Sequence, residues 1–114
     1  MIDAKPLVLA ALMKVEGFGG RVHPSFPDTF NKLPCASYYE ISNIPNAAAD
    51  DDEYLSEITF VVDIWAHGAE EVGKLAIEAN SEIKKAGFIR EFAADVNDPD
   101  GTIRHKTMRY RLIK

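Results

Sequence analysis

The sequence predicts an α+β fold in which an antiparallel sheet of about four or five strands packs against two α-helices. Two segments carry apolar residues at helical spacing, residues 57–66 alternate apolar and polar side chains, and residues 97–101 read as a turn between two strands. With 114 residues, 46% of them hydrophobic, the chain can bury one modest core but not two. Residues 1–114 are therefore expected to form one domain.

The first predicted element is an amphipathic helix over residues 2–15. Asp3 can cap its start, and Pro6 is tolerated in a first turn. The residues at helical spacing are Leu7, Ala10, Ala11 and Lys14. The glycines at positions 17, 19 and 20 then end the helix.

A short strand over residues 21–23 is expected next, followed by a proline-bounded loop. The prolines favour an extended, exposed path that costs little ordering entropy on binding, so the loop is a candidate contact segment. Its candidate interface residues are Pro24, Phe26, Pro27, Asp28 and Phe30. Residues 35–44 are rich in β-forming side chains and predict a second strand that stops at Pro45.

The clearest strand signal lies in residues 57–66. Ile58, Phe60, Val62 and Ile64 alternate with Thr59, Val61, Asp63 and Trp65. One face of this strand is therefore expected in the core. Residues 46–53, which precede it, are short-chained and acidic, and they predict a loop between antiparallel strands.

The last third of the chain predicts a helix and a hairpin. Apolar residues recur every three or four positions over residues 69–86, and Gly87 ends the pattern. Residues 88–96 and 102–113 then read as two strands joined by residues 97–101, where Pro99 presets φ and Gly101 tolerates a positive φ.

Charge is divided between two segments, although the net charge is only -5. Four acids stand together at Asp50, Asp51, Asp52 and Glu53, whereas the last thirteen residues contain no acid and include Arg104, Lys106, Arg109 and Arg111. Two interpretations stay open: a pair of solvated surfaces, or complementary patches that meet between subunits.

The sequence predicts no catalytic, cofactor-binding or metal site. His23, His67 and His105 fall on separate predicted elements, and Cys35 is the only cysteine, expected to fill the core as an inert thiol. Tyr38 and Tyr39 are neighbours in a strand and face opposite ways, so one is expected in the core and one at an interface. Trp65 is a further interface candidate. The apolar runs are too short to cross a membrane, and the N-terminus does not read as an export signal, so a cytoplasmic origin is expected.

Residues 22–41, VHPSFPDTFNKLPCASYYEI, resemble the "YPxxFxxLPCISYYE" segment of small tail-completion proteins of phages and prophages. His23 stands where tyrosine is more usual, and Ala36 where a larger aliphatic residue is usual. The resemblance extends in order through most of the chain. The further matching residues are Ser56, Glu57, Ile58, Phe60, Val62, Asp63, Ile64, Trp65, Gly87, Phe88, Arg90, Phe92, Asp95, His105, Lys106, Met108, Arg109 and Tyr110.

The resemblance implies a tail terminator or tail-to-head joining protein of long-tailed phages of Gram-positive bacteria. Such a subunit is not an enzyme. It forms a hexameric ring between the tail tube protein and the head connector protein, is monomeric in isolation where the ring needs its template, and meets DNA only as passing cargo. It would assemble in the host cytoplasm and end in the virion tail. Two alternatives stay open: a small nucleic-acid-binding or regulatory module that uses the basic C-terminal strand, and a small hydrolase or isomerase.

Overall fold

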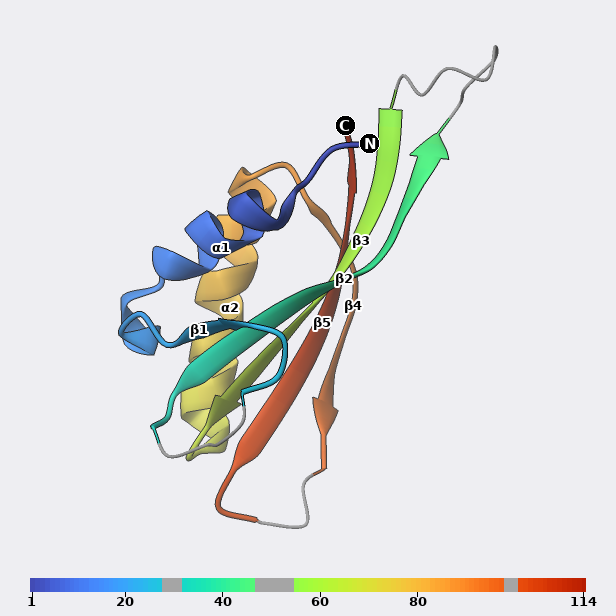
Figure 1. The fold of residues 1–114 in the computed structure, drawn as a ribbon. Helices are drawn as coiled ribbons and strands as arrows, with labels where there is room; N and C mark the ends of the chain where they lie inside the picture. The colour runs from blue at the N-terminus through green and yellow to red at the C-terminus, as the bar shows by residue number, and fades with distance from the viewer. Residues whose placement is uncertain (28–31, 47–54, 98–100) are drawn as a thin grey trace.

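The structure, a computed structural model, describes residues 1–27, 32–46, 55–97 and 101–114 (Figure 1). Its elements in chain order are α1 Lys5–Met13, the 3₁₀ turn η1 Glu16–Phe18, β1 Val22–Pro24, β2 Cys35–Asn46, β3 Leu55–Ala66, α2 Ala69–Lys85, β4 Ile89–Val96 and β5 Arg104–Ile113. Two helices and one five-stranded sheet confirm the predicted α+β class. Within the described residues, no helix combines the length and apolar character needed to span a membrane.

The five strands lie in the order β1-β2-β3-β5-β4. The pairs β2–β3, β3–β5 and β4–β5 are antiparallel, and the last of these confirms the predicted C-terminal hairpin. β1 instead runs parallel to β2, with Val22 opposite Ala36, so an all-antiparallel sheet was wrong for this edge. The two strands are separated by ten residues and not by a tight hairpin turn, which joins only antiparallel strands.

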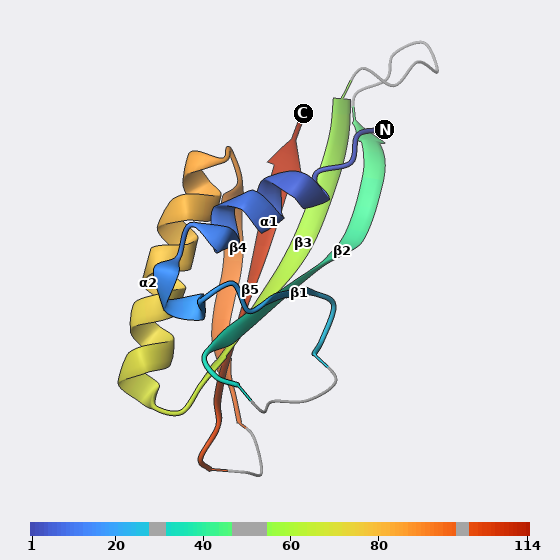
Figure 2. The same cartoon turned by 60° about the vertical axis from the view of Figure 1, so that its left-hand side comes forward.

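Both helices cover the same face of the sheet, as Figures 1 and 2 show from two sides. The core lies between these layers. Its central sheet residues include Ile58, Phe60, Met108 and Tyr110, all at most 1% exposed. Tyr110 Oη donates a hydrogen bond of 2.7 Å to Asn80 Oδ1 and thereby joins β5 to α2. Burial and this bond fix how α2 lies across the sheet.

The helix α1 is shorter than predicted, and it buries a different set of side chains. Asp3 Oδ1 accepts a hydrogen bond of 3.1 Å from the Lys5 amide, so Asp3 does satisfy a free N–H at this end. The buried helical residues are Val8, Ala11 and Leu12, whereas Ala10 and Lys14 are exposed. The buried stripe therefore differs from the predicted one. Ala4 and Val15, just outside the helix, extend it at both ends.

One prediction about strands needs correction, and another, the core face of residues 57–66, is confirmed. β2 does not stop at Pro45, because the strand continues to Asn46 and Pro45 lies opposite Ser56. Pro45 has no backbone N–H to donate. At this point β3 is the one described strand beside β2, so no sheet hydrogen bond is lost on the opposite edge of β2. β3 is buried on both faces at its end, since Val61, Asp63 and Trp65 are at most 7% exposed.

A candidate assembly surface

The sheet face opposite the helices, here called the outer face, is the candidate functional surface. Cross-strand registers place its rows: Tyr39, Val61, Arg109 and Phe92 form one, and Ile44, Glu57 and Ile113 form another nearer the chain termini. Neither helix covers these rows (Figure 2). The outer face therefore depends on its own side chains and on loops for cover.

Much of this face exposes large apolar side chains. The exposed ones are Tyr39, Ile44, Leu55, Ile89, Phe92, Val96 and Ile113, between 37% and 58% exposed. Single exposed apolar residues are normal on a protein surface, but these seven lie on one face of the sheet, among charged residues such as Glu57 and Arg109, and together form a mixed patch. Such patches mark surfaces that another molecule covers.

One end of the outer face is covered by an aromatic cluster, and Trp65 lies at the centre of this cluster. Phe26 packs edge-on against the indole with 5.4 Å between ring centroids and edge-on against Tyr39 at 6.0 Å. The His105 ring stacks on the indole at 4.5 Å. Trp65 is consequently 3% exposed while Phe26, its cover, is 55% exposed. The segment after β1 thus closes this end of the face, and Ser25, at φ 101°, turns the chain there.

Asp63 and His105 form a buried polar pair beside this aromatic cluster. Asp63 Oδ1 lies 2.6 Å from His105 Nε2, and their side chains are 3% and 12% exposed. Asp63 Oδ2 and Ser37 Oγ are buried and find no hydrogen-bond partner in the described part of the chain. The serine, histidine and acid do not form a nucleophile relay, because no Ser37–His105 bond connects them. The pair ties β3 to β5 under the aromatic cover.

Cys35 lies at the edge of the same cluster, opposite Trp65 in the register. It is 1% exposed, and burial raises the pKa of its thiol to about 11, with the nearby Arg21 charge opposing the shift. Arg21 was not expected from the sequence; its Nε donates to the Pro34 carbonyl at 2.8 Å and brings a cation near the thiol. Desolvation dominates, so the thiol is protonated and unreactive at neutral pH.

The basic strand β5 does not present one basic patch. Arg109 and Arg111 lie on the outer face, whereas Lys106 lies on the helix side, because successive strand residues alternate. Arg111 approaches Glu57 at 3.5 Å and Glu91 at 3.8 Å, and Lys106 approaches Asp95 at 3.4 Å. Arg109 is exposed and makes no ion pair within the described residues. This division weakens the nucleic-acid alternative.

The predicted interface residues therefore fall into three groups. Pro24, Phe26, Arg104 and Arg109 are exposed, Pro27, Lys106 and Arg111 are half-buried, and Trp65 is buried. Asp28, Phe30, Asp50, Asp51, Asp52 and Glu53 lie outside the described residues. The structure brings Phe26 and Trp65 into contact but keeps the basic residues on two faces. Contact of any of these residues with another chain stays a prediction.

The sequence reasoning missed most of the outer face. Ile89 and Phe92 were counted only as strand residues, and their exposure follows from a register that places Arg90 and Ala93 on the helix side. Residues 88–96 do not alternate regularly, and a register shift between Arg90 and Phe92 brings Ile89 and Phe92, three positions apart, to the same face. The Asp63–His105 pair joins residues 42 positions apart and needs the β3–β5 register to be seen.

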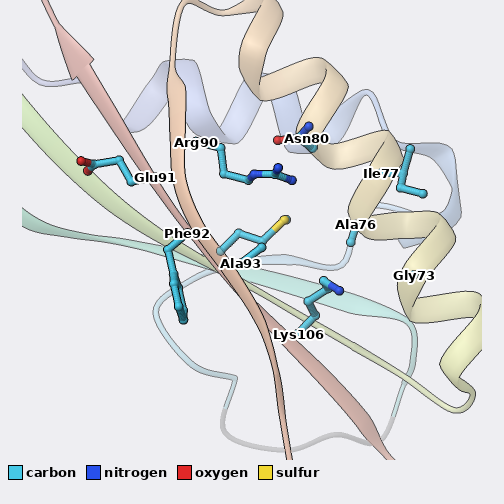
Figure 3. A pocket seen from close by; sticks show the side chains of 10 residues that line it. Gly73, Ala76, Ile77, Asn80, Arg90, Glu91, Phe92, Ala93 and Lys106 are labelled. Atoms are coloured by element: carbon cyan, nitrogen blue, oxygen red, sulfur yellow. The ribbon is translucent and has the colours of Figure 1, made fainter.

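The hollows of the molecule are open grooves between elements. One of about 540 Å³ lies between α2 and β4, and Figure 3 shows Arg90 and Lys106 beside it, with Phe92 pointing away. Another of about 590 Å³ lies between η1 and α2. Among the described residues, no three histidine, cysteine, aspartate or glutamate side chains group as metal ligands do.

Comparison with known proteins gives a likeness of fold. No protein-family model matches the chain, and no curated protein sequence matches it. Among solved structures, a chain from the virion of the native gene transfer agent (GTA) particle matches with a TM-score of 0.53 and 15% sequence identity. The match covers 92% of this chain and 92% of that chain. The fold seen here is thus similar, over nearly its whole length, to the fold of a chain in that virion.

Proposed function

We propose that this chain is a structural subunit of a phage or prophage tail. In this proposal it forms a ring, expected to be hexameric, that terminates the tail tube or joins it to the head connector. Its partners are copies of itself, the tail tube protein and the connector protein, while DNA only passes through. The proposal assigns the chain no catalytic step.

The observation that carries the proposal is the uncovered outer face. An eight-residue edge strand, β4, and several large apolar side chains of the outer face stay exposed in the single chain. A free edge and an apolar face are both costly for an isolated soluble protein, and association with other chains removes both costs. The fold likeness to a chain of the GTA virion supports the same kind of assembly.

The experiment mixes the purified chain with tail tubes or with connectors and examines the products by electron microscopy. Rings at tube ends or on connectors are expected, and immunogold should then label the same place in particles. A tail or virion preparation that contains no copy of this chain would overturn the proposal. A monomer in isolation would not, because such a ring can depend on its template.

A further inference from the structure

β4 is the more open of the two edges of the sheet. At the opposite edge, β1 has three residues and ends at Pro24, and β2 behind it carries Pro45 and a register shift after Glu40. Short strands, prolines and such irregularities all hinder pairing with another chain. β4 has eight residues, contains neither proline nor lysine, and has no strand beyond it in the described part of the chain. A further strand can therefore add to the sheet at β4.

The side chains of β4 are arranged so that the strand complements itself. Seven of its residues take consecutive places on the ladder with β5, and Glu91 falls outside this series because the register shifts between Arg90 and Phe92. The seven residues in order are Ile89, Arg90, Phe92, Ala93, Ala94, Asp95 and Val96. The middle place belongs to Ala93, the two end places are aliphatic, and the places next to the ends carry opposite charges.

Antiparallel pairing of two β4 strands about Ala93 uses this symmetry. Side chains that lie opposite each other in such a pair share one face of the sheet, and places equally far from the centre of β4 also share a face. We infer that two copies of this chain associate by pairing their β4 strands in this way. Across the two copies, the opposite residues are then Ile89 and Val96, Arg90 and Asp95, Phe92 and Ala94, and Ala93 with itself.

The charges on β4 support this register. Arg90 is exposed and makes no ion pair within the described residues, and the side chain of Asp95 is 77% exposed although it approaches Lys106 at 3.4 Å. Arg90 of each copy lies opposite Asp95 of the other copy, so two pairs of opposite charge form. Figure 3 shows Arg90 on the α2 side of β4 and Glu91 on the other side, where Glu91 lies 3.8 Å from Arg111. Glu91 therefore does not face Asp95 of the second copy.

The groove between α2 and β4 leaves room for the added strand. α2 packs mainly over β3 and β5, so the α2 side of β4 stays open as a groove of about 540 Å³. Ala93 lines this groove, and its small side chain lets two copies meet there. On the other side of β4, Ile89, Phe92 and Val96 are 58%, 50% and 40% exposed. Pairing thus covers the free edge and brings these apolar side chains against the second copy.

The paired β4 strands form a two-fold contact, because each copy offers the same patch. Such a contact closes as a dimer, whereas a ring that runs head to tail needs two different patches. The pairing is therefore distinct from the contact between neighbouring subunits of the proposed ring. The inference goes beyond the proposed function and describes the free chain, which covers its β4 edge in a dimer before it meets its template.

Disulfide cross-linking of single variants tests the register. Ala93→Cys places two thiols at the two-fold axis, where opposite Cα atoms lie about 4.5–5.5 Å apart, within the range that a disulfide spans. Ala94→Cys is the matched control, because Ala94 is also half-buried but lies opposite Phe92 and about 8 Å from its own copy. Cys35 is 1% exposed and stays out of the reaction. Ala93→Cys is expected to give about tenfold more covalent dimer than Ala94→Cys under mild oxidation.

Charge variants add a second readout that misfolding does not imitate. The two-fold axis applies each substitution twice, so Arg90→Glu should raise the dissociation constant of the dimer, measured by sedimentation, by about tenfold. Adding Asp95→Arg to Arg90→Glu restores opposite charges across the pair and should recover most of this loss. The matched reversal Lys14→Glu on α1 should leave the dissociation constant unchanged.

Three results would overturn the pairing and leave the proposed function standing. They are a wild-type chain that sediments as a monomer up to its solubility limit, equal yields of covalent dimer from the two cysteine variants, and no recovery in the double charge variant. A dimer with the expected cross-link and charge response, in a chain that is absent from tails, would overturn the proposed function alone.

Discussion

Replacing Phe26 by alanine tests whether the segment after β1 covers the outer face at Trp65. Phe26 makes two edge-to-face ring contacts, at 5.4 Å with Trp65 and 6.0 Å with Tyr39. Each such contact contributes about 0.5–1.5 kcal/mol beyond the area it buries, so Phe26→Ala should lower the free energy of unfolding by about 1–3 kcal/mol. Urea denaturation followed by tryptophan fluorescence measures this loss.

The same variant has two local reporters, because the chain contains one tryptophan and one cysteine. Trp65 is 3% exposed and Cys35, its register partner, is 1% exposed. Loss of the Phe26 ring should shift the Trp65 emission to longer wavelength and speed the reaction of Cys35 with a thiol reagent. Phe92→Ala is the matched control, since Phe92 lies on the same face and is 50% exposed, close to the 55% of Phe26. Unchanged emission and thiol reactivity in Phe26→Ala would refute this description of the outer face.

Three further predictions follow from named contacts. Burial raises the pKa of Cys35 from 9.0 to about 11, so the folded state holds the thiol proton more tightly and stability is lost as pH rises from 9 towards 11. Between pH 8 and 10, the free energy of unfolding of the wild type should fall by about 1.3 kcal/mol more than that of Cys35→Ala, as chemical denaturation at each pH measures. Equal losses in the two proteins would contradict the raised pKa. Tyr110→Phe removes the 2.7 Å bond to Asn80 and should cost about 1 kcal/mol, with a coupling to Asn80→Ala in a double-mutant cycle; additive losses would show that the bond contributes nothing. Arg109 is exposed and has no ion pair in the described chain, so Arg109→Glu should weaken assembly on tubes or connectors and leave the thermal midpoint nearly unchanged. If the wild type instead binds DNA with an affinity that falls steeply as salt rises, the nucleic-acid alternative is favoured.

The sequence was sufficient for the elements, because local patterns encode them. Alternation in residues 57–66 identified β3, helical spacing in residues 69–86 identified α2, and the turn at residues 97–101 identified the C-terminal hairpin. The parallel pairing of β1 with β2 could not be predicted, since it depends on how the ten residues between the two strands connect them. The predicted end of β2 at Pro45 was wrong because proline ends a strand only where the sheet needs a backbone N–H at that position.

The candidate surface was harder to predict because it depends on relative placement. A basic last strand was visible in the sequence, but the alternation of strand side chains sends Lys106 and Arg109 to different faces. Trp65 was predicted as an interface residue, whereas within the single chain Phe26 and His105 cover it and leave it 3% exposed. The outer face becomes visible only after both helices are seen on one side of the sheet.

The proposed function requires that other protein chains in a tail cover the outer face. A cryo-EM reconstruction of assembled particles that contain this chain measures this most directly. We expect a ring of copies at the end of the tail tube in which Ile44, Phe92 and Ile113 lie buried against neighbouring chains. A reconstruction that resolves the chain elsewhere, with these side chains facing solvent, would contradict it.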